Sequence, residues 1–244
     1  MEYIKLGIKI IMPRIVNFVI AALAGIALVL LFVSSGEPLV PFLRDTQLAP
    51  LLYALSWPNV IVFNLSVGYL SSMIFWILVV YLPDQSRRNL LRNTLAIQYK
   101  DFKKEIIQTL LWAAGESHDI QLIEDMADDH MKFKEYFNSK GERWSATLNG
   151  IQGNRKHMYE LHLAMKIFSD EVSYVLNNVP INDPSVHCLL RRLNENMFRL
   201  TNSETDLYDQ VKSVSNFLWQ ILSSWNIAEG QLEDDIVQRM IARI

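Results

Sequence analysis

The stretch Asn59–Leu82 reads N-V-I-V-F-N-L-S-V-G-Y-L-S-S-M-I-F-W-I-L-V-V-Y-L and carries no charged residue over 24 positions. This length is sufficient for a helix to cross a bilayer with some tilt. Pro58 suits the first turn of a helix, where its missing N–H is unpaired in any case. Trp76 and Tyr81 suit the membrane interface at the far end. The sequence therefore predicts a transmembrane helix over residues 58–82.

A second uncharged stretch precedes it, over Ile15–Val33. Its 19 residues span roughly 28 Å as a helix, close to the hydrocarbon thickness of a bilayer. A cleaved signal peptide is the alternative, because Lys5, Lys9 and Arg14 form a basic start to the chain. The apolar stretch is longer than a signal peptide's, and another span follows it. We therefore predict a transmembrane helix over residues 15–33.

Basic residues flank both predicted spans on the sides away from the connector, residues 34–57. Arg87, Arg88 and Arg92 follow the second span, whereas the connector holds only Arg44. The positive-inside rule then predicts that both termini are cytoplasmic and that the connector faces outward. Leu48–Leu55 is apolar but too short to span, so we expect it at the outer membrane surface. The membrane module is residues 1–83.

Small and polar residues recur every four positions in both spans. This spacing is typical of close helix–helix packing, and it also fits a weakly polar pore lining in an oligomer. Neither span carries an Asp, Glu, Lys, Arg or His, which argues against a proton-coupled transporter or a charge-selective filter. The candidates for packing or pore lining are Asn17, Ala21, Gly25, Asn64, Gly68, Ser71 and Ser72.

The remaining residues, 84–244, have the pattern of a helical domain. Apolar positions from Leu95 to Leu110 predict one long helix that leaves the membrane, and helices follow over 120–137, up to about Leu200, and over 232–244. Two seams with alternating spacings of three and four fit a bundle core or a coiled coil. The fold class is all-α: two transmembrane helices followed by a cytoplasmic helical bundle. The seams are Met158, Leu161, Met165, Phe168, Val172, Val175 and Leu207, Val211, Val214, Leu218, Ile221, Trp225.

Charge is segregated within this domain, with a net of +4 over residues 84–104 and −8 over residues 105–244. The basic stretch is placed to meet anionic lipid headgroups at the cytoplasmic leaflet. Direct nucleic-acid binding is not expected, because the body behind the stretch is acidic. The headgroup candidates are Arg87, Arg88, Arg92, Lys100, Lys103 and Lys104.

Side chains that carry chemistry do not form a catalytic signature. The acidic cluster Glu124–His130 fits a solvated helix face better than a metal site, because no second helix offers a matching Glu-x-x-His. His157 and His162 are five apart and do not share a face, and Cys188 fits a half-buried small side chain. Nucleotide cradles and serine-nucleophile motifs are missing. We predict no enzyme activity, metal or cofactor.

In layout, the spans Ile15–Val33 and Asn59–Leu82 and the helical remainder resemble the two-transmembrane-helix effectors of bacterial anti-phage defence systems, of the retron or cyclic-oligonucleotide type. The resemblance implies an inner-membrane protein that oligomerises and permeabilises the membrane when its cytoplasmic domain senses a partner protein or signal. No residue role follows from it. The alternative is a membrane-tethered scaffold or sensor whose spans only anchor it.

Overall fold

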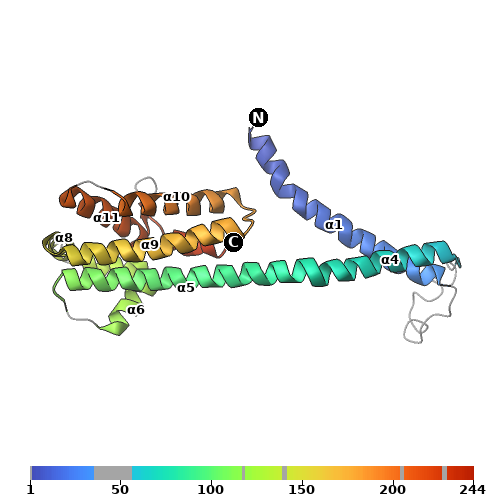
Figure 1. Cartoon of the computed structure of the whole chain (residues 1–244), viewed down its shortest axis with the longest axis horizontal. Coiled ribbons are helices and arrows are strands. Elements are labelled where there is room, and N and C mark those ends of the chain that lie inside the picture. Colours follow the sequence, from blue (N-terminus) through green and yellow to red (C-terminus); the bar gives the residue numbers. More distant parts are fainter. Residues whose placement is uncertain (1, 36–56, 117–118, 139–141, 204–205, 227–229) are drawn as a thin grey trace. The chain divides into compact units, whose positions relative to one another are not determined.

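The computed structural model describes residues 2–35, 57–116, 119–138, 142–203, 206–226 and 230–244, and side chains are described outside 2–17 and 225–231. It divides into two compact units, Met1–Arg87 and Arg88–Ile244 (Figure 1). Residues 36–56 of the predicted connector, which include the predicted surface segment Leu48–Leu55, lie outside the described residues, as does the side chain of Asn17.

The first unit contains an antiparallel pair of helices, α1 (Glu2–Ser34) and α4 (Val60–Trp76). The Trp57 amide donates to the Val33 carbonyl at 3.0 Å, and the Tyr69 hydroxyl donates to the Ile20 carbonyl at 3.4 Å. The side chain of Asn59 accepts from the first free amides of α4 and is its N-cap. Our placement of Pro58 in the first helical turn is therefore wrong, because the cap follows it.

The second predicted span does not end at Leu82, because α4 continues through the π-helical turn η1 (Ile77–Tyr81) into α5 (Leu82–Ala113). Pro83 has no N–H and its ring crowds the preceding turn, which usually kinks or ends a helix. In η1 the Leu82 amide reaches back to the Ile77 carbonyl, one residue further than in an α-helix. This wider turn directly upstream accommodates the proline, so the helical run is continuous from Val60 to Ala113.

Among the described residues, this run is the one long and apolar enough to cross a membrane. Its most apolar window has a mean hydropathy of 2.0, and 6% of that window is buried. The apolar part of α1 whose side chains are described, Phe18–Ser34, is a shorter helix. A core helix of a soluble protein would be mostly buried, so the exposure of this window is its most informative property.

The second unit is built from helices around one core (Figure 1). Two strands of two residues each, β1 (Trp225–Asn226) and β2 (Gly230–Gln231), pair antiparallel. With α5, the helices are α6 (Ile120–Asp128), α7 (His130–Asn138), α8 (Glu142–Gly153), α9 (Arg155–Asn178), α10 (Pro184–Thr201), α11 (Leu207–Leu222) and α12 (Ile236–Ile241). The predicted all-helical bundle is thus confirmed.

Two predicted helix boundaries are wrong for the same physical reason, an aspartate that caps a new helix. Asp129 interrupts the helix predicted over 120–137, and its side chain accepts from the Met131 amide at 2.8 Å. Asp235 accepts from the Val237 and Gln238 amides, so the last helix begins at Ile236 and not at Leu232. A carboxylate that bonds a backbone amide two or three residues ahead favours a helix start at that point.

Among the residues whose side chains are described, both predicted seams pack into the core of the bundle. The seam of α9 is buried throughout, from Met158 at 4% exposure to Val175 at 0%. Its Phe168 ring stacks on Phe102 of α5, with the ring centroids 4.9 Å apart. In α11 the seam ends with the helix at Leu222, and Trp225 belongs to β1.

Candidate functional site

The small residues that pack α1 against α4 are not those of the predicted stripes. Ser66 is the buried residue of α4, and Tyr69 and Met73 are half-buried on the same side. Across from them, Ala27 of α1 is buried and Ala24 is half-buried. Alanine and serine let two helix backbones approach closely, so this face accounts for the antiparallel contact.

The predicted stripe on α4 lies on the other side of the helix. Asn64, Gly68 and Ser72 are exposed, and two residues of helix turn a side chain by about 200°, so Asn64 lies opposite Ser66. A Cβ added at Gly68 would meet nothing within 4 Å, and the same holds at Gly25 of α1. The remaining described candidates, Ser71 and Ala21, are also exposed. None of these six positions takes part in packing α1 on α4.

The two polar groups of the α4 stripe differ in how they are satisfied. The Ser72 hydroxyl donates to the Gly68 carbonyl at 2.8 Å, within its own helix. The Asn64 amide makes no hydrogen bond to another residue in the part of the chain that the structure describes. Within the described residues, the Ser72 hydroxyl is thus satisfied by its own helix, whereas the exposed Asn64 amide is not.

The three lysines of the basic stretch are bound to acidic side chains of the domain. Lys100 lies 2.7 Å from a carboxylate oxygen of Asp128, and Lys104 lies 2.7 Å from Glu124. The hydrogen bond to Glu124 raises the pKa of Lys104. The Lys103 side chain is 9% exposed, so our prediction that it contacts lipid headgroups is wrong. For the other five residues it stays a prediction: Lys100, Lys104, Arg88 and Arg92 are half-buried and Arg87 is exposed.

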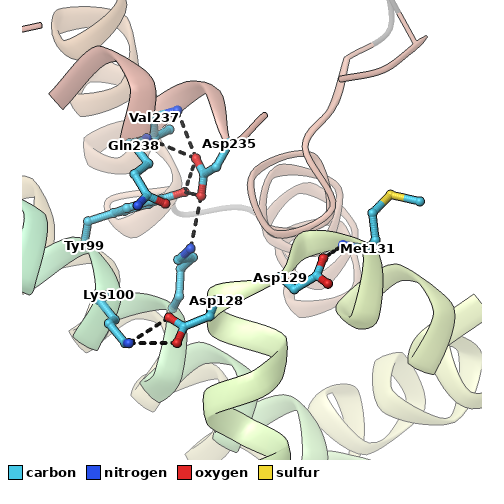
Figure 2. Close-up of polar contacts among 9 residues, drawn as sticks. Tyr99, Lys100, Asp128, Asp129, Met131, Asp235, Val237 and Gln238 are labelled. Carbon is cyan, nitrogen blue, oxygen red and sulfur yellow. Dashed lines mark hydrogen bonds and ion pairs between the residues drawn. The ribbon is translucent and has the colours of Figure 1, made fainter. Parts of the chain in front are cut away.

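Lys103 belongs to a buried polar cluster with Tyr99 and Asp235, and Figure 2 labels the latter two residues. The Tyr99 hydroxyl lies 3.0 Å from both oxygens of the Asp235 carboxylate, and Lys103 Nζ lies 3.1 Å from one of them. The ammonium also lies over the Tyr99 ring, 4.9 Å from its centroid. Burial, and then the charge and hydrogen bonding of Asp235, raises the pKa of Tyr99 well above its usual value. The hydroxyl therefore stays protonated and donates.

Sequence reasoning missed this cluster because Asp235 lies more than 130 residues along the chain from Tyr99 and Lys103. One signal was present. Lys103 falls among the apolar positions Tyr99, Phe102 and Ile106, on the inner face of the predicted helix. A lysine on an apolar helix face requires a buried partner of opposite charge, although the pattern does not say which one.

The acidic cluster of α6 serves as a set of structural contacts. Glu124 and Asp128 bind lysines of α5, and Asp129 caps α7. Asp125 bonds Lys132 at 3.0 Å, and the hydrogen bonds from Lys132 and Gln121 lower the pKa of its carboxyl. Among the described residues, no group of three or more His, Cys, Asp or Glu side chains is placed to hold a metal ion.

The second unit, Arg88–Ile244, also has a cleft of about 390 Å³ between α9 and the end of α10. Its wall includes the aromatic side chains Tyr159 and Phe198, 67% and 64% exposed. His162 lines the cleft, its Nε2 atom is buried without a hydrogen-bond partner, and burial lowers its pKa. Cys188 on α10 is exposed, so the prediction of a half-buried thiol is wrong.

No protein-family model, no curated protein and no solved structure matches this chain.

Proposed function

We propose that this chain is a bacterial inner-membrane effector that oligomerises and permeabilises the membrane when residues 84–244 sense a partner protein or signal, in defence against phage. The observation that supports this proposal is that the α4 stripe faces away from α1 and is exposed. The stripe consists of Asn64, Gly68, Ser71 and Ser72. Small residues and an unpaired amide on a lipid-facing surface favour a second helix against them.

In this proposal both α1 and α4 cross the membrane. Their apolar side chains are exposed on several sides, as at Phe18 (75%), Ile61 (79%) and Leu65 (73%). Lipid is the solvent that such a surface favours. Both termini are cytoplasmic, and Arg87, Arg88 and Arg92 meet the anionic headgroups of the inner leaflet.

One helical hairpin cannot enclose a path through the membrane, so permeabilisation requires several copies. The stripe of α4 and the small residues Ala21 and Gly25 of α1 lie on different helices, and both are exposed. A contact between the α4 stripe of one copy and α1 of the next is heterologous, and repetition of such a contact closes a ring when the rotation between neighbouring copies divides a full turn. The Asn64 amide then finds its partner across this contact or in a water-filled lumen.

A link from the cytoplasmic domain to the membrane is supplied by the helical run Val60–Ala113. Its first part carries the stripe, and its last part contributes Leu95, Tyr99 and Ile106 to the core of the domain. A change in how the domain holds α5 therefore acts on the same helix that lines the proposed contact.

The test is to express the chain in bacteria and follow growth and membrane potential, for the wild type and for Asn64→Leu, Gly68→Leu and Ser72→Leu. We expect depolarisation by the wild type and its loss in the three variants, because the larger apolar side chains block the contact. Val67→Leu and Ala22→Leu enlarge exposed positions of α4 and α1 outside the stripes and serve as controls. Equal toxicity in wild type and stripe variants, or no depolarisation by the wild type, contradicts the proposal.

A membrane-tethered scaffold or sensor is the second candidate, and the exposed pair Tyr159 and Phe198 favours it. Aromatic side chains beside a cleft are typical anchors of protein–protein contacts. Replacement of residues 1–82 by an unrelated two-span anchor separates the two functions. A scaffold keeps its activity after this exchange, whereas a permeabilising effector loses it.

A further inference from the structure

The carboxylate of Asp235 forms hydrogen bonds with two helices, the C-terminal helix α12 and the long helix α5. It accepts from Lys103 of α5. As Figure 2 shows, it also accepts from Tyr99 of α5 and, through Oδ1, from the Val237 and Gln238 amides at the start of α12. Its side chain is 11% exposed. One buried group thus satisfies two donors on α5 and two on α12 at the same time.

Among the described residues, the Asp235 carboxylate is the counter-charge of the buried Lys103 ammonium. In the described part of the chain, Asp235 is the acidic residue within ion-pair distance of it. Its other close neighbour is the Tyr99 ring, which itself packs against Phe168 with centroids 5.4 Å apart. A buried ammonium that loses its counter-charge is strongly destabilised, so removal of Asp235 favours any movement that brings Lys103 to water.

The helix α12 is also too short to persist without its contacts. It has six residues, and an isolated helix of that length is not stable in water. It is held by its Asp235 cap, by the buried side chains Val237, Met240 and Ile241, and by an ion pair of Arg243 with Asp183. Loss of the cap therefore weakens its whole attachment.

We propose that the Asp235 carboxylate couples the packing of residues 232–244 to the packing of α5, a coupling that we call the latch. While residues 232–244 are packed on α5, Tyr99 and Lys103 stay buried. When this segment separates from the domain, α5 packs less tightly at these two residues. Undocking of α12 and loosening of α5 are then one coupled event. The latch is a statement about the local stability of α5 and α12, so its first test does not measure activity. Its use as a trigger of permeabilisation rests on the proposed function and is tested separately.

The first test is hydrogen exchange of the full chain in lipid nanodiscs, for wild type, Asp235→Asn and Asp234→Asn. Asparagine still caps a helix, so the first variant removes the charge and keeps the cap. Asp234 is the matched control, with a side chain 70% exposed and a loose ion pair to Arg239 at 3.7 Å. We expect exchange about tenfold faster or more at residues 236–241 and 96–106 together in Asp235→Asn. Faster exchange in α12 alone, or equal effects of both variants, overturns the latch.

A rescue variant shows that the coupling is electrostatic. The double change Lys103→Met and Asp235→Asn removes the buried charge that the single variant leaves unpaired. We expect the α5 amides to regain most of their protection, and no recovery overturns the latch. If Asp235→Asn unfolds the whole domain, the single variant Lys103→Met tests the latch instead, because it leaves the Asp235 cap of α12 unchanged. It must speed exchange at 96–106 and 236–241 more than Lys100→Met does, whose ion pair is exposed.

The second test measures dye release from vesicles of phosphatidylethanolamine and phosphatidylglycerol. With the latch as trigger, Asp235→Asn releases dye about tenfold faster than Asp234→Asn. If the exchange data show coupling while no variant and no wild type releases dye, the proposed function fails and the latch stands. If the wild type releases dye and Asp235→Asn does so no faster, the latch is not the trigger.

Discussion

The backbone of Gly150 in α8 touches the last residue of α5: a Cβ added at Gly150 would lie 1.8 Å from the Ala113 carbonyl oxygen. Both partners of this contact are main-chain atoms, so no side-chain rotation relieves an overlap. Glycine at this position is what lets α8 close over the end of the long helix.

Gly150→Ala is therefore expected to destabilise the domain by about 2 kcal/mol or more, because α8 must move away from Ala113. Gly153→Ala in the same helix is the matched control, since a Cβ there meets nothing within 4 Å. That control should be neutral or stabilising by about 0.5–1 kcal/mol, from reduced flexibility of the unfolded chain. Chemical denaturation in detergent, followed by circular dichroism, measures both. Similar losses in the two variants would show that the Gly150 contact is not tight.

Leu161 and Leu163 of α9 should differ sharply in the cost of truncation. Leu161 is fully buried, whereas Leu163 is 44% exposed. We expect Leu161→Ala to lower the free energy of unfolding by about 2–5 kcal/mol, from lost burial and the cavity left behind. Leu163→Ala should cost less than about 1 kcal/mol. The same denaturation experiment compares them, and the reverse order would place the seam in a contact between copies.

Stability should fall as the pH drops below the ordinary histidine pKa, through His162. Burial lowers the pKa of this side chain below its usual 6.5. Between the two values the unfolded chain binds a proton here and the folded chain does not, so protonation favours unfolding. His162→Gln should flatten the dependence of the thermal midpoint on pH between about 7 and 5, where an ordinary histidine titrates. The exposed His187→Gln is the control, and identical slopes in both variants would rule out this contribution.

The single cysteine offers a topology measurement on the unaltered chain. Cys188 is exposed on α10, in the part predicted to be cytoplasmic. A membrane-impermeant maleimide should label it in inverted inner-membrane vesicles and leave it unlabelled in intact spheroplasts. A Cys188→Ser variant measures background labelling. Labelling from the outside of spheroplasts would reverse the predicted orientation of the chain.

Helix boundaries show where periodicity loses its predictive power. The apolar spacing correctly predicted the long helix through Leu95 and Leu110, because a buried face repeats every three or four residues over many turns. It did not predict the break at Asp129 or the late start at Ile236, because each depends on one carboxylate bonding a nearby amide. The predicted span ended at Leu82 because the uncharged stretch ends there, and a π turn before Pro83 leaves no periodic signal that the helix continues.

The sequence by itself determined the helical class, the uncharged stretches and the segregation of charge, because these depend on composition and on local spacing along the chain. The tertiary structure alone decided which way the stripe of Asn64 and Gly68 points, since both sides of α4 are apolar enough to pack. It also decided that Lys103 is a core residue bound to Asp235 rather than a lysine at the membrane surface. The partner of a buried charge is chosen by the folding of distant segments onto one another, and no local pattern along the chain encodes that choice.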